Sequence, residues 1–465
     1  MDRPHPILLP IAGFLIFFMT GFLSTNAQIS NTTTYSRVKI FFGDKTIRDL
    51  GSLGIPVDHG QVKKGVFIIS DYSERTIRKI DTAGYRYNIL IEDVQEFYKK
   101  RNRNSNANSK RQKRKQQLND KCGYQQPYPV PAGFSLGSMG GFFTYQEMLN
   151  HLDSMAANYP GLITTRLPIS NDTTHNGHSI YYLKISDQPG IDQNEPEILY
   201  TGLHHAREPA SLSNLIYFMY YLLENYADDP AIQYLVDNTE MYFVPCVNPD
   251  GYIYNQQTDP NGGGMWRKNR RDNGDGTFGV DLNRNYGYEW GYDNNGSSPD
   301  PSTQVYRGDS AFSEPETQIM RQFTINHDFR IALNYHTYSN LMIYPWGYQG
   351  SFKTADSSTF RNYANHITKD NNYLYGTGDE TVGYVINGGS DDWMYGQQTV
   401  KNKILSMTPE IGSLGFWPPS NEIIRQCKDN MWQNLRSAFL LLNYGRLKEQ
   451  SPVLTDRINN DFVYR

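Results

Sequence analysis

Two histidines and one glutamate have the types and the spacing of a catalytic metal site. His205 and Glu208 are three residues apart, and His336 lies far downstream. Two neutral imidazoles and one carboxylate bind Zn²⁺ while leaving its fourth position to water, which a catalytic zinc needs and a structural zinc does not. His204 is a rival first ligand, although it stands four residues before Glu208. Spacing alone leaves two interpretations open, a metal site or a hydrogen-bonded pair in a core.

Each candidate follows an apolar segment with the composition of a β-strand. Residues 197–202 precede His205, residues 331–335 precede His336, and residues 404–409 precede a further candidate, Glu410. In open α/β sheets, reacting groups gather at the carboxyl ends of the strands. We therefore expect the three segment ends to converge on one site.

Strand-like and helix-like segments alternate over most of the chain. Helices are expected at residues 144–159, 212–226, 316–327 and 422–444, and strands at residues 179–185, 197–201, 240–247, 330–335 and 404–407. This alternation predicts an α/β fold with a mixed, mostly parallel sheet sandwiched by helices. A smaller unit precedes it, with strands at 37–42 and 66–69 and a helix at 73–81, which is typical of a compact α+β module.

Seven segments between residues 205 and 410 form a specific pattern. They are His205-Ala206-Arg207-Glu208, Asn248-Pro249-Asp250-Gly251, Trp266-Arg267-Lys268, Asp281-Leu282-Asn283-Arg284-Asn285, His336-Thr337-Tyr338-Ser339, Gly388-Gly389-Ser390-Asp391-Asp392-Trp393 and Thr408-Pro409-Glu410. In this order they resemble the zinc metallocarboxypeptidases of the carboxypeptidase A/B family (funnelin type), here in a secreted precursor form. The resemblance implies the zinc-carboxypeptidase fold and a monomer that acts on peptide or protein C-termini. It also implies one Zn²⁺ per chain, bound by His205, Glu208 and His336.

The resemblance implies a role for each polar residue near the metal. Glu410 would be the general base that takes a proton from water and returns it to the leaving amine. Arg267 would stabilise the oxyanion. Arg284 and Asn283 would bind the terminal carboxylate of the substrate. The remaining substrate-binding residues are Arg207, Tyr338 and Tyr384, the last of them in a loop that closes over the substrate.

Asp391 occupies the position that separates a basic from an apolar preference within the family. A carboxylate at the pocket floor would pair with a Lys or Arg side chain, so we expect a preference for C-terminal Lys or Arg, or a dual basic and apolar specificity. Two other functions stay open, a peptidoglycan stem-peptide amidase of the same fold and a non-catalytic zinc- or peptide-binding module. Arg284 and Tyr384 favour ordinary peptide substrates over the first, and Glu410 and Arg267 argue against the second.

The N-terminus and a basic stretch predict an exported precursor. An apolar run from Ile7 to Leu23 and a small-residue site ending at Ala27 are typical of a signal peptide. Residues 97–119 hold nine Lys and Arg and no acid, although the whole chain has a net charge of -4. Behind an export signal, we interpret this stretch as a target for an activating trypsin-like protease rather than a nucleic-acid arm. The expected segments are a signal peptide (1–27), a propeptide-like α+β module (28–98), a basic disordered cleavable linker (99–123), a catalytic domain (124–446) and a C-terminal tail (447–465).

These features place the mature protein outside the cell, secreted or periplasmic, with no nucleic-acid partner and no stable membrane insertion. Three cysteines allow one disulfide, for example of Cys122 with Cys427, but the sequence does not determine which cysteines pair. Cys246 lies in an apolar run and is expected to be a buried free thiol.

Overall fold

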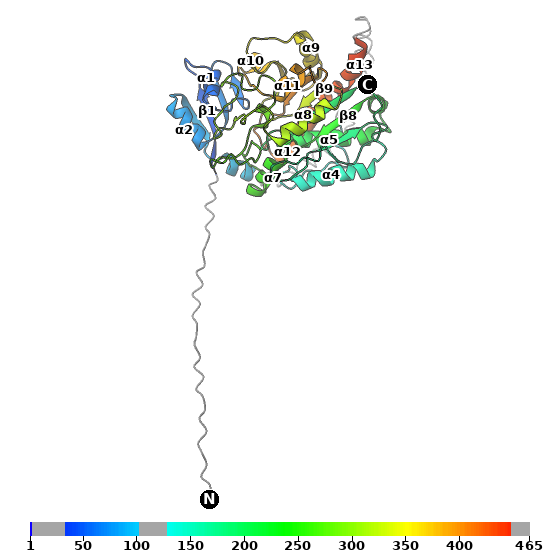
Figure 1. Cartoon of the computed structure of the whole chain (residues 1–465), viewed down its shortest axis with the longest axis horizontal. Helices are drawn as coiled ribbons and strands as arrows, with labels where there is room; N and C mark the ends of the chain where they lie inside the picture. Colours follow the sequence, from blue (N-terminus) through cyan, green and yellow to red (C-terminus); the bar gives the residue numbers. More distant parts are fainter. Residues whose placement is uncertain (2–32, 102–127, 448–465) are drawn as a thin grey trace, which may run out of the picture. The chain divides into compact units, whose positions relative to one another are not determined.

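The computed structural model describes residues 33–101 and 128–447, together with Met1 (Figure 1). The predicted signal peptide after Met1, the predicted linker after Arg101 and the tail after Leu447 lie outside the described residues. The chain divides into two units, Met1–Thr33 and Thr34–Arg465, and every element named below belongs to the second. Within the described ranges, no helix is both long and apolar enough to cross a bilayer.

The N-terminal module, residues 34–101, is built on a four-stranded antiparallel sheet in the order β2-β3-β1-β4. Its elements are β1 (Tyr35–Phe41), α1 (Ile47–Ser52), β2 (Gln61–Lys63), β3 (Phe67–Ser73), α2 (Glu74–Thr82), β4 (Arg86–Ile91) and a helix at residues 94–101. α2 begins where the Ser73 hydroxyl accepts a hydrogen bond from the Thr76 amide. The predicted α+β character of this module is confirmed, and α1 and β2 are additions to the prediction.

The larger region contains an eight-stranded mixed sheet in the order β11-β10-β12-β9-β7-β8-β6-β5. Its strands are β5 (Leu167–Pro168), β6 (Tyr181–Ile185), β7 (Glu197–Thr201), β8 (Glu240–Val244), β9 (Phe329–Asn334), β10 (Leu341–Ile343), β11 (Leu374–Gly376) and β12 (Leu405–Glu410). The central run β12-β9-β7-β8 is parallel throughout, and β5, β6 and β10 introduce the antiparallel pairs. The predicted mixed, mostly parallel sheet is confirmed.

The central strands are buried on both faces, because helices cover the sheet on each side. In β7, Ile198 and Tyr200 pack into one apolar cluster while Leu199 packs into another, as the two-residue period of a strand requires. α5 contributes to the first cluster and α8 to the second. Strands covered on both faces consist of continuous apolar runs, which is why these segments are recognisable in the sequence.

The helices of this region largely follow the predicted segments. They are α4 (Tyr145–Asn158), α5 (Pro209–Asn225), α6 (Pro230–Val236), α7 (Pro249–Thr258), α8 (Pro315–Ile325), α9 (Ser357–Ile367), α10 (Gly378–Thr381), α11 (Ser390–Gly396), α12 (Ser420–Asp429) and α13 (Met431–Leu447), with a 3-10 turn at Leu282–Arg284. The single closing helix predicted at 422–444 is wrong, because α12 and α13 meet at Asn430. The side-chain amide of Asn430 bonds to the Gln426 carbonyl and to the Tyr373 hydroxyl, and such bonds compete with a continuous helix.

The apolar core of the N-terminal module is shared with the larger region. Val38, Ile40 and Ile68 of its sheet belong to one cluster with Ile343 and Tyr384. The module therefore packs against the loop that carries Tyr384, and this contact places the segment between α1 and β2 at the site described next.

The thiols of Cys246 and Cys427 are both buried and free among the described residues, and Cys122 lies outside those residues. The prediction for Cys246 is confirmed, whereas the disulfide of Cys122 with Cys427 involves a residue outside the described ranges and stays a prediction.

Candidate metal centre and active site

Three neighbouring parallel strands, β7, β9 and β12, deliver the predicted residues to one edge of the sheet. His336 lies two residues beyond β9 and forms a bridge pair with Glu410, the last residue of β12. The amide of His336 donates to the Pro409 carbonyl at 2.9 Å. The positions of His336 and Glu410 are thus fixed by a single strand register, and the predicted convergence of the strand ends is confirmed.

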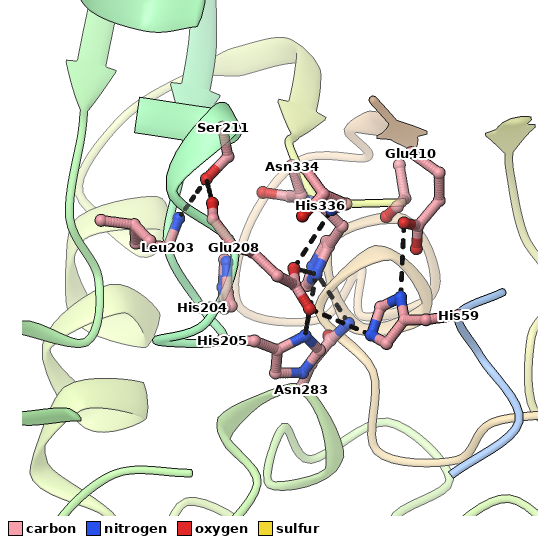
Figure 2. Close-up of polar contacts among 12 residues, drawn as sticks. His59, Leu203, His204, His205, Glu208, Ser211, Asn283, Asn334, His336 and Glu410 are labelled. Atoms are coloured by element: carbon pink, nitrogen blue, oxygen red, sulfur yellow. Dashed lines mark hydrogen bonds and ion pairs between the residues drawn. The ribbon is translucent and has the colours of Figure 1, made fainter. Parts of the chain in front are cut away.

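A short loop between β7 and α5 carries the other two metal candidates. The Ser211 hydroxyl donates to the carbonyl of Glu208 at 2.7 Å and accepts from the amide of Leu203 at 3.1 Å (Figure 2). Leu203 has a φ of +53°, which turns the chain sharply after the strand. This tie brings His205 and Glu208 to the carboxyl end of β7.

The side chains of His205, Glu208 and His336 meet in a buried cluster (Figure 2). Glu208 Oε1 lies 2.8 Å from His205 Nδ1, Glu208 Oε2 lies 2.9 Å from His336 Nδ1, and the two Nδ1 atoms are 3.0 Å apart. Tetrahedral zinc with ligands at about 2.0–2.1 Å has ligand–ligand separations of roughly 3.3 Å. The donor types and their spacing therefore fit a zinc ion. Without a cation, the lone pairs of two imidazole nitrogens and a carboxylate would face one another, which is unfavourable.

The outer partner of His205 also fits a metal ligand. Its Nε2 lies 3.0 Å from Asp281 Oδ1, and Asp281 accepts two further bonds from Arg267, at 2.8 and 3.0 Å. A carboxylate behind the ring holds the tautomer with a proton on Nε2 and the lone pair of Nδ1 toward the metal. Burial alone would raise the pKa of Asp281, but Arg267, His205 and Arg284 hold it well below its ordinary value.

The charges in the cluster keep Glu208 ionised. Burial would raise the pKa of Glu208, but His205, His59 and His336 hold it well below its usual range. Burial lowers the pKa of His205, which favours the neutral imidazole that metals bind. The rival, His204, is buried with its Nε2 2.9 Å from the Tyr286 hydroxyl, so it serves the core and not the cluster.

The arginines predicted to act on the substrate are buried beside the cluster and hold a carboxylate of the N-terminal module. Asp58 Oδ2 lies 2.5 Å from Arg267 Nη2 and 2.8 Å from Arg284 Nη2. Burial would raise the pKa of Asp58, but Arg267, His59 and Arg284 hold it well below its ordinary value. Asn283 lies next to them, with its Nδ2 3.3 Å from His336 Nε2.

Asp391 lies in the same pocket as Arg284, Glu410, His205 and Tyr384. Its carboxylate accepts only neutral hydrogen bonds, which are contributed by Ser406 Oγ at 2.5 Å, Thr408 Oγ1 at 2.6 Å and Asn334 Nδ2 at 2.7 Å. Burial raises the pKa of Asp391, although these three donors oppose the shift. Its charge is thus positioned by polar groups and not balanced by a cation among the residues that bond to it.

Two further predicted substrate residues lie outside that pocket lining. Arg207 is buried with its guanidinium 4.2 Å from the centre of the Phe416 ring, and its Nε and Nη1 have no hydrogen-bond partner among the described residues. Tyr338 packs edge-on against Phe416 with ring centroids 5.0 Å apart. Their assignment to substrate binding stays a prediction.

His59 is a residue of the site that the sequence did not reveal. It belongs to the segment between α1 and β2, and its ring is buried with Nε2 3.0 Å from Glu208 Oε1 and Nδ1 3.4 Å from Glu410 Oε2 (Figure 2). Burial lowers the pKa of His59, but Asp58, Glu208 and Glu410 outweigh it and raise the pKa to about 9. The available signal was that His59 is the one histidine in residues 33–101.

A buried cluster of two histidines and a glutamate, at the strand ends of an α/β sheet and beside a carboxylate and two arginines, defines a metal-dependent hydrolase. Residues 148–433 match the protein-family model described as zinc carboxypeptidase (Peptidase_M14). The chain belongs to this family, which makes it a metallocarboxypeptidase that uses zinc and acts on peptide C-termini.

Relatives agree with this membership. Carboxypeptidase B of Astacus astacus is 32% identical over 293 residues, which cover 61% of this chain and 91% of that protein. Carboxypeptidase A1 of Sus scrofa is 28% identical over 353 residues, which cover 74% of this chain and 76% of that protein. These relatives favour a carboxypeptidase over the peptidoglycan amidase considered from the sequence.

Solved structures show the same fold. The crystal structure of carboxypeptidase A from Helicoverpa armigera matches with a TM-score of 0.69 at 20% identity, over 89% of this chain and 99% of that chain. The crystal structure of thrombin activatable fibrinolysis inhibitor matches with a TM-score of 0.66 at 20% identity, over 88% of this chain and all of that chain. These shares of this chain are larger than residues 128–447 alone could supply, so the N-terminal module takes part in both matches.

Proposed function

We propose that the chain is the latent precursor of a zinc exopeptidase that removes the last residue of a peptide, with His205, Glu208 and His336 as its zinc ligands. The observation that carries this proposal is the convergence of three ligand side chains, whose nearest polar atoms are 2.8–3.0 Å apart, at the carboxyl ends of adjacent strands. His336 is 128 positions from Glu208 in the chain, so its meeting with Glu208 and His205 requires the tertiary fold and is not a local contact.

The chemistry divides between the bound metal and the protein. Zinc, when bound, polarises the scissile carbonyl and acidifies water. Glu410 takes the proton from that water and returns it to the leaving amine. Its position supports this role, because Glu410 forms a β-bridge pair with the zinc ligand His336. Arg267 donates to the oxygen that becomes negative, and its two bonds to Asp281 hold the guanidinium in place beforehand.

Recognition of the free C-terminus falls to Arg284, with Arg267 and Asn283 beside it. The arrangement around Asp58 supports this role, because a carboxylate is held there between two buried guanidinium groups. A substrate carboxylate has the same charge and shape, so it can take the same place. Tyr384 lines the pocket and would cover the bound residue.

A preference for C-terminal Lys or Arg would come from Asp391. Its three neutral donors fix the carboxylate but leave the charge available to a cation that enters the pocket. Dual specificity is the alternative outcome, and kcat/KM for peptides that end in Arg, Lys, Leu or Phe measures the difference.

Latency is supported by the position of the N-terminal module. Asp58 occupies the arginine pair that a substrate needs, and Tyr384 is packed into the core of the module. A substrate therefore cannot enter until the module leaves, which we propose follows cleavage within residues 99–123 by a trypsin-like protease outside the cell. Trypsin treatment of the full chain should raise its activity, and a full chain that is already fully active would contradict latency.

The mechanism is tested by Glu410→Gln in the trypsin-activated protein. Loss of the general base should lower kcat by roughly 10²- to 10⁴-fold while one zinc per chain is retained. Glu422→Gln is the matched control, because Glu422 pairs with Arg425 on α12 and takes no part in the site. Near-normal turnover by Glu410→Gln would overturn the assignment.

A further inference from the structure

The segment Val57-Asp58-His59-Gly60 places an imidazole at the metal cluster. His59, His205 and Glu208 each offer a ligand atom, and these three atoms lie within 4.8 Å of one another. His59 is buried, and its Nε2 is 3.0 Å from Glu208 Oε1, a separation close to those among the other donor atoms of the cluster. The N-terminal module thus contributes a side chain with the chemistry of a zinc ligand.

The surroundings of His59 resemble those of His205. In His205, one ring nitrogen faces Glu208 and the other faces the carboxylate of Asp281. In His59, Nε2 faces Glu208, and Nδ1 lies 3.4 Å from the carboxylate of Glu410, which is an ion-pair contact and not a hydrogen bond. A carboxylate behind the ring orients a metal-binding histidine and makes it a better donor.

The backbone on both sides of His59 is fixed, so the ring is held in place before any metal arrives. Asp58 is clamped by the two arginines on one side. On the other side, the Ser339 hydroxyl donates to the Gly60 carbonyl at 3.0 Å. Gly60 has a φ of +131°, and a Cβ there would lie 2.4 Å from the Ile69 carbonyl oxygen, so only glycine allows the chain to pass.

We propose that His59 is a fourth protein ligand of the zinc in the precursor, in the coordination position that the catalytic water takes after activation. This inference rests on the proposed function, since it needs His205, Glu208 and His336 to hold the metal. It deepens that function because the N-terminal module would then keep the precursor inactive in two ways, by covering the substrate pocket and by binding the zinc. Glu410, which must face water to act as a base, faces the His59 ring instead.

One contact must change for this coordination. Arg267 Nη1 lies 2.7 Å from His59 Nε2, and because an arginine N–H can only donate, this contact requires the neutral ring. Coordination of a metal uses the same Nε2 lone pair that accepts this hydrogen bond, so a zinc ion would take the place of Arg267 at His59. Arg267 keeps its bonds to Asp281 and Asp58 when it gives up this contact.

The test counts imidazole ligands in the uncleaved full chain loaded with one zinc. X-ray absorption at the zinc edge should show three imidazoles in the wild-type precursor and two in His59→Gln. The matched control is Gln61→Ala at the start of β2, which removes an exposed hydrogen bond to the Ser413 carbonyl at 3.3 Å and should leave three imidazoles at the zinc. In a chelator competition, the zinc affinity of His59→Gln should be at least ten-fold lower than that of the wild-type precursor or of Gln61→Ala.

Two imidazoles in the wild-type precursor would overturn the inference, as would equal zinc retention by all three proteins. If His59→Gln does not fold, the ligand count of the wild-type precursor still decides. Failure of the proposed function gives a different result. A trypsin-treated wild-type chain that binds no zinc or hydrolyses no C-terminal residue contradicts that function, whereas an active, zinc-containing protein whose precursor shows two imidazoles contradicts only the role of His59.

Discussion

The ion pairs of Asp58 offer a quantitative test of how firmly the N-terminal module is held. Asp58 is 7% exposed, and its Oδ2 is shared by Arg267 and Arg284, whose side chains are almost fully buried. Removing one partner from a buried charge pair costs about 3–5 kcal/mol. Arg267 keeps Asp281 as a partner at 2.8 Å, so the lower end of this range applies to Asp58→Asn.

A loss of about 3 kcal/mol in docking raises the population of the open precursor roughly 100-fold. The rate of hydrolysis by the uncleaved full chain, divided by the rate after trypsin activation, should rise by this factor. The assay uses a peptide ending in Arg, and mass spectrometry confirms that the chain stays intact.

Arg48→Ala is the control for the same interface. Its ion pair with Asp379 has a 2.6 Å separation, but the two side chains are 43% and 20% exposed. Such a pair contributes about 0.5 kcal/mol, which changes the open population only about two-fold. If Asp58→Asn raises the activity of the intact chain no more than Arg48→Ala does, then the buried pairs do not hold the module and the reasoning is refuted.

Three further outcomes follow from the described contacts. Asp391→Asn should lower the ratio of kcat/KM for Arg-ending over Leu-ending peptides by about 10- to 100-fold, since a hydrogen bond to a charged group contributes about 1.5–3 kcal/mol. An unchanged ratio would mean that another residue sets the specificity. Asp281→Asn should weaken zinc binding by about 10- to 100-fold in a chelator competition, because it loosens His205, and unchanged affinity would contradict that role. Burial raises the pKa of Glu316 on α8 from an ordinary 4.5 to about 7, so the folded state favours the protonated carboxyl group. The contribution of this group to the free energy of unfolding is complete below pH 4.5 and is lost as the pH rises through 7. The free energy of unfolding in urea should fall by about 3 kcal/mol over this range, and Glu316→Gln should flatten the profile.

The sequence predicted the central strands well because parallel strands covered on both faces are continuous apolar runs. β7, β9 and β12 all lie at their predicted positions, so the meeting of His205, His336 and Glu410 followed from the strand-end rule. The three-residue strands β10 and β11 were not predicted, because a run of so few residues is too short to show the two-residue period of a strand. β10 pairs with β12 and β11 pairs with β10, so the place of each strand depends on a partner about 30 or more residues away in the chain.

The role of His59 could not be predicted for a different reason. The segment around it has neither helical nor strand periodicity, and 146 positions separate it from His205. Its place is set by the packing of one folded module on another, through Asp58 and the shared apolar cluster. Such contacts between modules leave no pattern in a single sequence.

The shared apolar cluster has a consequence for the time course of activation. A cut within residues 99–123 removes a covalent connection but leaves intact the apolar cluster to which Tyr384, Ile343, Val38 and Ile40 belong. Activity should therefore appear after a lag, during which the cut module still covers the site and must dissociate or be degraded. The lag should lengthen with protein concentration if the released module binds again, so the same segment that keeps the precursor silent would act as a dissociable inhibitor of the mature enzyme.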